Sequence, residues 1–290
     1  MSAPPLGAAA ALDRLAAAQP ALRDAAALLA ALLAAGRALR PALAAGVPDE
    51  ERARVRLAEG IPALAGEPLL SGEALLRDVR ALADALRAAP GADVAGAPAA
   101  AALVADALER ARAALDVDAL AAAALAGGWE EVAALAPRLD VDEDALVTVL
   151  DHAVRPTLRA AAAPLRDAIA RAPWMQGICP ACGARPLLAE LRASSPEGES
   201  ERTLRCGRCA SAWPFPRVAC AACGTRDHRQ LAYLHADGED AYRRAQTCDA
   251  CLAYLKELAL LDPLDAELLL VEDLATVALD MVAVERGYRR

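Results

Sequence analysis

Eight cysteines, all in CxxC pairs, constrain this 290-residue chain more than any other feature of its sequence. No lysine or arginine precedes Arg14, so we expect no secretory signal and a cytoplasmic chain. Disulfides are rare in that compartment, and CxxC pairs there predict metal ligands. The eight expected ligands are Cys179, Cys182, Cys206, Cys209, Cys220, Cys223, Cys248 and Cys251.

The cysteine pattern repeats once, because corresponding cysteines of the two copies are 41 or 42 residues apart. Each copy runs from a CxxC pair through an apolar stretch and a turn signal to a second pair. The turn signals are at 196–198 in the first copy and at Asp237-Gly238 in the second. A hairpin would bring both pairs of one copy to the same end, so that four sulfurs surround one tetrahedral ion. Gly183 and Gly224, which follow the first pair of each copy, fit a turn that needs an unusual φ.

Three groupings of the cysteines satisfy this pattern. A cross-brace would join the first pair with the third and the second pair with the fourth, and a nested arrangement would join the two inner pairs. We favour sequential modules, which keep each repeat intact. The sequential modules are Cys179/Cys182 with Cys206/Cys209, and Cys220/Cys223 with Cys248/Cys251.

The spacing does not decide which metal is bound. Four thiolates bind zinc, and the same tetrahedral set binds a single iron, so we expect two ions per chain, iron or zinc. Structural sites of this kind commonly contribute folding energy alone. We expect Trp213 and Phe215 to shield the second pair, and Arg205, Arg208 and Arg217 to offset the thiolate charge.

The rest of the chain predicts an α plus small β fold. Residues 1–172 are rich in alanine and leucine at helical spacing and predict an all-α bundle. A helix expected from about 142 to 172 should be kinked or split by Pro156 and Pro164. Residues 173–262 should form the tandem four-cysteine modules, at about 179–209 and 220–251, and residues 263–290 a C-terminal helix that packs back on the body.

The apolar residues of that last helix recur at steps of three and four and predict one buried stripe. Its acidic residues, Glu272, Asp273 and Asp280, are expected at the helix start and on a solvated face. The expected stripe consists of Leu270, Leu274, Val277, Met281, Val284 and Tyr288.

Composition excludes several classes of function. The net charge is −9 and the pI about 5.0, which disfavours binding to nucleic acid or to an anionic membrane. An uncharged run at 25–36 is shorter than the roughly 20 residues that a membrane span needs, so no membrane insertion is expected. We find no phosphate loop, nucleophile elbow or triad and predict that the chain is not an enzyme.

Residues 174–288 resemble the FdhE family of formate dehydrogenase accessory proteins. The resemblance lies in the segments WMQGICPACG, RCGRCASAW, RVACAACG, TCDACLAYLKEL and EDLATVALDMVAVERGY, in that order. It implies a helical N-terminal region followed by two rubredoxin-like or zinc-ribbon-like modules, with the eight cysteines as metal ligands. It also implies a cytoplasmic protein that assists formate dehydrogenase maturation and contacts the catalytic subunit before export. The alternatives are a zinc-ribbon nucleic-acid-binding regulator and a dithiol redox protein.

Overall fold

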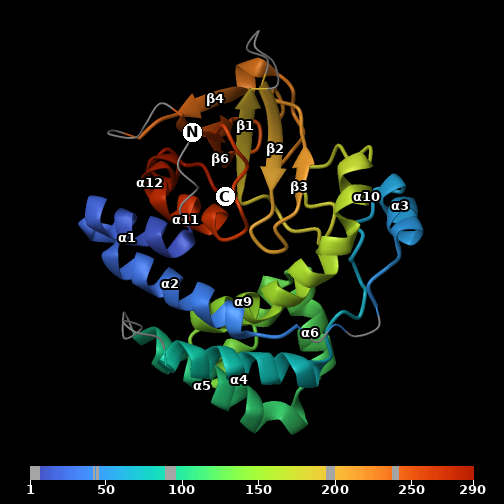
Figure 1. Ribbon diagram of the computed structural model, residues 1–290, viewed down its shortest axis with the longest axis vertical. Coiled ribbons are helices and arrows are strands. Elements are labelled where there is room, and N and C mark those ends of the chain that lie inside the picture. The colour runs from blue at the N-terminus through green and yellow to red at the C-terminus, as the bar shows by residue number, and fades with distance from the viewer. Residues whose placement is uncertain (1–6, 42, 44–45, 89–95, 194–199, 237–241) are drawn as a thin grey trace. The chain divides into compact units, whose positions relative to one another are not determined.

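The computed structural model describes the chain except for residues 1–6, 42, 44–45, 89–95, 194–199 and 237–241 (Figure 1). The expected turns at 196–198 and Asp237-Gly238 lie outside the described residues. The chain divides into two compact units, which are described in turn: unit 1 is Met1–Asp49 with Leu64–Pro164, and unit 2 is Glu50–Ala63 with Leu165–Arg290. Across the described ranges, no helix combines the length and apolar character that crossing a bilayer requires.

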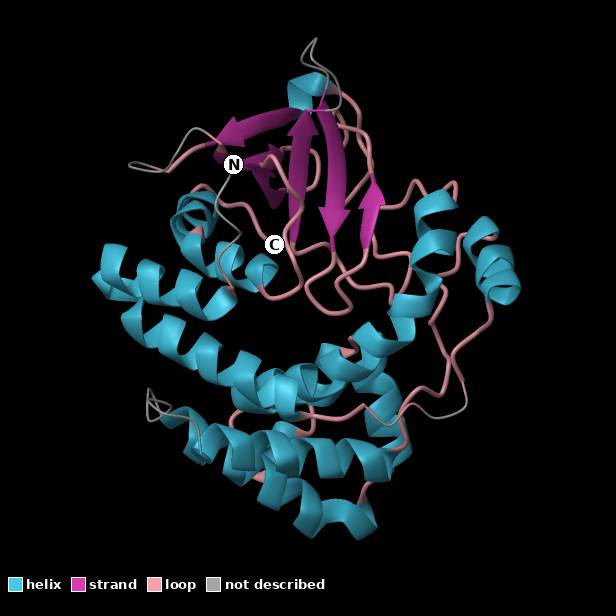
Figure 2. Ribbon diagram, viewed as in Figure 1, coloured by secondary structure: helices cyan, strands magenta, loops and turns pink. Residues whose placement is uncertain are grey.

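The regular structure of unit 1 is helical throughout its described residues (Figure 2). Its elements are α1 (Ala8–Ala18), η1 (Pro20–Leu22), α2 (Arg23–Ala38), α4 (Gly72–Ala88), α5 (Ala97–Ala111), η3 (Arg112–Ala114), α6 (Val117–Ala126), α7 (Trp129–Ala133), α8 (Ala136–Leu139) and α9 (Glu143–Ala162).

Helix α4 contacts α2, α5, α6 and α9. Its buried side chains follow the helical period, because Leu75, Val79, Leu82 and Leu86 all lie on one face and are at most 2% exposed. At its start Gly72 approaches α6 closely, and a Cβ there would lie 2.4 Å from a backbone carbon of Val117. Only glycine therefore fits at this crossing.

Helix α9 shows how the two prolines act. Asp142 caps its start, accepting a hydrogen bond of 2.8 Å from the backbone N–H of Ala145. The helix runs through Pro156 and ends at Ala162, where η4 (Ala163–Leu165) contains Pro164. The expected split therefore occurs at Pro164 and not at Pro156. Burial of the α9 face on both sides of Pro156 outweighs the loss of one backbone donor.

Unit 2 is built on a six-stranded sheet with the order β3-β2-β1-β6-β5-β4 (Figure 1). All neighbouring strands are antiparallel except β1 and β6, which are parallel. The strands are β1 (Leu188–Ala193), β2 (Ser200–Arg205), β3 (Ala212–Pro214), β4 (Leu231–Leu234), β5 (Arg243–Cys248) and β6 (Ala253–Ala259). The helical elements of unit 2 are α3 (Glu50–Ala58), α10 (Arg166–Arg171), η5 (His228–Gln230), α11 (Leu268–Ala275) and α12 (Val277–Glu285).

The two four-cysteine modules share this sheet. The first copy of the repeat supplies β1, β2 and β3, and the second supplies β4, β5 and β6. They join where Ala189 pairs with Glu257 and Leu191 pairs with Ala259. The predicted fold class, a helical N-terminal part followed by two small β modules, is thus confirmed, and the parallel junction is a feature that the repeat alone did not predict.

The C-terminal segment differs from the expected single helix. It forms α11 and α12, with a break at Thr276, whose hydroxyl donates a 2.7 Å hydrogen bond to the carbonyl of Glu272. The break changes the buried face, so Leu279 and Ala283 are fully buried and Met281 and Val284 are each 60% exposed. The predicted stripe is therefore wrong at Met281 and Val284, whereas Tyr288 is partly buried and packs against the core of the second module. Leu279 and Ala283 pack with Leu234, Ala236, Ala245 and Tyr254 of the second module.

We expected Glu272, Asp273 and Asp280 at a helix start and on a solvated face, but each of them pairs with a basic side chain of the sheet. Glu272 lies 2.8 Å from Arg243 of β5. Lys256 of β6 is completely buried, and its Nζ lies 2.7 Å from Asp273 Oδ1 and 2.7 Å from Asp280 Oδ2. The same ammonium donates a 2.7 Å hydrogen bond to the backbone carbonyl of Asp273. The carboxylates face the sheet because they neutralise the only lysine of the chain.

Candidate metal centres

The structure gathers the eight cysteines into two groups of four. Within each group the sulfur atoms all lie within 4.8 Å of one another, so each group could hold one metal ion. The grouping is the sequential one, and neither the cross-brace nor the nested arrangement is seen. The groups are Cys179, Cys182, Cys206 and Cys209, and Cys220, Cys223, Cys248 and Cys251.

The distances between sulfurs match a tetrahedral ion. Four thiolates at bond lengths of 2.3 Å would lie about 3.8 Å apart. In the first group, Cys179 and Cys209 are 3.5 Å apart and Cys182 and Cys206 are 3.6 Å apart. The second group has two separations of 3.7 Å, Cys220 to Cys251 and Cys223 to Cys248. A disulfide needs about 2.05 Å, so the donor set fits a metal and not a pair of disulfides.

Each CxxC pair ends in a turn with the same backbone conformation. The residue after the second cysteine has a positive φ, and its N–H donates to the carbonyl of the first cysteine of the pair at 2.8–3.1 Å. The prediction for Gly183 and Gly224 is confirmed, whereas Ala210 and Leu252 adopt the same conformation with a side chain. The φ angles are 78° at Gly183, 63° at Ala210, 75° at Gly224 and 57° at Leu252.

The two groups differ in exposure. All four cysteines of the first group are buried, whereas in the second Cys223 is exposed and Cys251 is partly exposed. Burial raises the pKa of the Cys179 thiol, and hydrogen bonds from the other three thiols lower the pKa of Cys206. In the metal-free first group, the protons are therefore held more tightly by some thiols than by others. A metal ion would have to displace these protons, so the affinity of the group for a metal should rise with pH.

The aromatic residues beside the second pair are in the core, as predicted. Trp213 is completely buried and Phe215 is 7% exposed. The indole N–H of Trp213 donates to the backbone carbonyl of Gln176 at 3.2 Å. Arg205 does not serve the sulfurs as expected, because its guanidinium pairs with the buried carboxylate of Glu190 and donates to the carbonyl of Leu264.

Sequence reasoning missed Gly177, which brings the segment before the first group against the second group. A Cβ at Gly177 would lie 1.6 Å from the backbone oxygen of Ala221. Ala221 lies inside the pair Cys220/Cys223, so Gly177 is in contact with the backbone that holds two of the second group's sulfurs. A glycine two residues before Cys179 was the only signal in the sequence.

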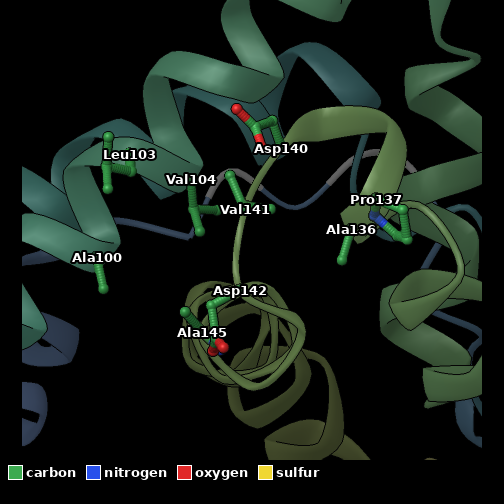
Figure 3. A pocket seen from close by; sticks show the side chains of 9 residues that line it. All are labelled: Ala100, Leu103, Val104, Ala136, Pro137, Asp140, Val141, Asp142 and Ala145. Carbon is green, nitrogen blue, oxygen red and sulfur yellow. The ribbon is translucent and has the colours of Figure 1, made fainter.

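A pocket of about 330 Å³ lies within unit 1, between α5, α8 and the start of α9 (Figure 3). One carboxylate oxygen of Asp142 in its lining already caps α9. The lining is otherwise mostly apolar, and we assign it no chemistry. The lining residues are Ala100, Leu103, Val104, Ala136, Pro137, Asp140, Val141, Asp142 and Ala145.

The fold and the sulfur groups define a protein with a helical unit and two four-cysteine modules on one sheet. The family profile described as FdhE, C-terminal domain, matches residues 218–290. The crystal structure of the FdhE protein from Pseudomonas aeruginosa aligns with 98% of this chain and 92% of its own, at 32% identity and a TM-score of 0.67. The chain belongs to the FdhE family.

Two curated relatives agree with this assignment over the C-terminal part of the chain. Protein FdhE homolog of Pseudomonas aeruginosa is 38% identical over 116 residues, which are 39% of this chain and 37% of the relative. Protein FdhE of Escherichia coli O127:H6 is 34% identical over 112 residues, or 39% of this chain and 35% of the relative. In these alignments the chain spans little more than a third of the curated relatives' length.

Proposed function

We propose that the chain is a non-catalytic accessory protein for the maturation of formate dehydrogenase and that it binds the catalytic subunit before export. Membership of the FdhE family supports this role. The observation that carries the proposal is the pair of four-sulfur groups on one continuous sheet, because they would give the second unit a rigid surface that can be presented to a client.

The eight cysteines would hold two ions, one in each group. Zinc would supply structure alone, and iron would also allow a change between the ferrous and ferric states. Each pair contributes two thiolates from one tight turn, and the hairpins β1-β2 and β4-β5 bring the two pairs of a module together. The chain's own contribution is thus to fix four sulfurs before the ion arrives.

Two features support a cytoplasmic protein that does not act on nucleic acid. The cysteine sulfurs lie 3.5–3.7 Å from each other and form no disulfides, which suits a reducing compartment. The net charge of −9 opposes a polyanionic partner and leaves a protein client as the better one.

The experiment has two parts. Elemental analysis with a visible absorption spectrum of freshly purified protein should give about two ions per chain. A red colour would indicate ferric thiolate, and a colourless protein would indicate zinc. Capture of a formate dehydrogenase catalytic subunit, with and without its cofactor, then tests the accessory role. Lack of capture of both forms would contradict the proposal.

A further inference from the structure

In the first module, another segment of unit 2 covers the turn of the first cysteine pair. The N–H of Ala63 donates at 2.8 Å to the carbonyl of Pro180, which lies inside that pair. Pro62 packs over the end of the turn, since its Cγ lies 3.4 Å from the position that a Cβ would take at Gly183. Cys182 is only 7% exposed. The covering segment therefore shields this cysteine from reagents in solution.

The equivalent turn of the second module has no such cover. Corresponding residues of the two copies are 41 apart here, so Cys223 and Gly224 correspond to Cys182 and Gly183. In the part of the chain that the structure describes, no atom beyond the adjacent residues lies within 4 Å of a Cβ placed at Gly224. Cys223 is exposed, whereas Cys182 is buried. One ligand of the second group can therefore be reached from solvent without any movement of the chain.

The second pair of this group is held by residues near the end of the sequence. The hydroxyl of Tyr288 donates at 2.6 Å to a carboxylate oxygen of Asp249, which follows Cys248 directly. The N–H of Arg289 donates at 2.8 Å to the carbonyl of the residue after Cys251. These contacts fix the turn of the second pair. The exposed cysteine of the first pair is therefore the most accessible ligand of the group.

A hydroxyl beside the sulfurs of the first group has no counterpart in the second. Ser211 Oγ lies 3.2 Å from Cys209 Sγ, within hydrogen-bonding distance. The offset of 42 that relates Cys209 to Cys251 relates Ser211 to Ala253, whose methyl group cannot donate. A hydroxyl that donates to a thiolate stabilises its charge and strengthens the hold of a site on its metal. The first group is thus better sealed and also better supported than the second.

We infer that the second group is a metal-exchange site, at which a thiol from solution replaces Cys223, and that the first group keeps its ion as part of the fold. In the exchange the incoming thiol gives up its proton and takes the place of Cys223, which leaves as a thiolate and takes up a proton. No electron is transferred. The same exchange at the first group needs a local opening of its cover, which costs free energy. The inference rests on the part of the proposed function that gives each group an ion.

Zinc release from the full-length chain, loaded with two zinc ions, tests this role. Glutathione serves as the entering thiol and EDTA takes up the released zinc, while native mass spectrometry counts the ions that remain. We expect one ion to leave about tenfold or more faster than the other, because only the slow ion waits for local opening. The fast rate should rise with the glutathione concentration, and the slow rate should not.

Thiol labelling of the same zinc-loaded chain identifies which group releases the fast ion. N-ethylmaleimide, followed by peptide mass mapping, should label Cys223 first and the four cysteines of the first group last, because exposed thiolates react and buried ones do not. The variant Cys179→Ser with Cys206→Ser damages the first group and should show the fast phase alone. Should this variant fail to fold, the labelling order of the parent chain still assigns the two phases.

The outcomes separate this inference from the proposed metal sites. If the zinc-loaded chain holds no ion, the metal sites fail and the exchange role fails with them. Equal release rates, a fast rate that ignores glutathione, or labelling of the first group before Cys223 would overturn the exchange role alone. A chain that retains a single ion is decided by the labelling map: labelled cysteines in the second group support the exchange role, and labelled cysteines in the first group overturn it.

Discussion

Arg202 and Glu257 join the two four-cysteine modules through a buried ion pair. Arg202 Nε on β2 lies 2.8 Å from Glu257 Oε1 on β6, and the two side chains are 0% and 1% exposed. The pair therefore spans β1, which lies between those strands. Arg202 also donates to the side-chain oxygen of Gln246 at 3.0 Å and to the carbonyl of Ala219 at 2.8 Å, both in the second copy or the segment that leads to it.

Replacing Glu257 alone should be worse than replacing both members of this pair. Glu257→Leu leaves Arg202 as a buried charge without a carboxylate and should lower the free energy of unfolding by about 3–5 kcal/mol. Arg202→Met should cost less, because Glu257 keeps its ion pair with Arg244 at 3.0 Å. The double variant removes the buried charge of Arg202 together with its partner and should cost less than Glu257→Leu. Denaturant unfolding of the metal-loaded proteins measures this. Additive losses in the double variant would show that the two charges do not interact.

Lys256 should not tolerate arginine, although every other basic side chain among the 31 lysines and arginines is arginine. Its ammonium carries three N–H donors, and three oxygen acceptors of Asp273 and Asp280 lie 2.7 Å from it. A planar guanidinium does not match this geometry. We expect Lys256→Arg to lower the free energy of unfolding by about 1–3 kcal/mol through overpacking, and Lys256→Met by about 3–5 kcal/mol. Equal stability of Lys256→Arg and the parent would contradict this.

The ion pair of Lys256 with Asp273 should make the free energy of unfolding depend on pH. Burial alone would raise the pKa of Asp273, but Arg290 and Lys256 outweigh it and lower that pKa. Because the pKa of Asp273 is lower in the folded chain than in the unfolded chain, where it is about 3.9, the ionised carboxylate stabilises the fold above that pH. This stabilisation is lost as the pH falls through the pKa of the folded chain. The stability difference between the parent and Lys256→Met should therefore shrink below about pH 4.

Gly177 should accept no side chain. Gly177→Ala forces a methyl group into the backbone oxygen of Ala221, so the two segments must separate and the second cysteine group must distort. We expect a loss of about 3 kcal/mol or more in the free energy of unfolding and weaker binding of the second ion. Gly36→Ala is the matched control, because no atom lies within 4 Å of a Cβ there and its helix α2 should gain up to about 1 kcal/mol. Unchanged metal content and stability in Gly177→Ala would disprove the close contact.

His152 should stay neutral in mildly acidic solution. Burial, and next the charge of Arg155, lowers its pKa to about 3. Because the folded pKa lies below the unfolded value of about 6.5, this group contributes stability above pH 6.5 that is lost toward pH 3, by up to about 1.4 kcal/mol per pH unit. The chain has three histidines, so nitrogen NMR can follow this imidazole directly. A titration midpoint near 6.5 would contradict the expectation, and His152→Gln should remove the corresponding slope.

The cysteine repeat predicted the local structure of the modules because both pairs of each copy are linked by one hairpin. It could not predict the junction of β1 with β6, since parallel pairing between strands far apart in sequence leaves no local pattern. The helical period predicted that residues 1–172 are helical, but the period of the last segment did not predict the buried face of α12, because the helix breaks at Thr276. Lys256 was visible as the single lysine, yet its two carboxylate partners are set by tertiary packing alone.

Counting ions in paired serine variants tests most directly whether each module holds its own metal. Native mass spectrometry of Cys179→Ser with Cys206→Ser should find one ion, because both changes fall in the first group. Cys179→Ser with Cys220→Ser damages both groups and should leave none. The reverse result, none in the first variant and one in the second, would mean a cross-braced arrangement and would contradict the account.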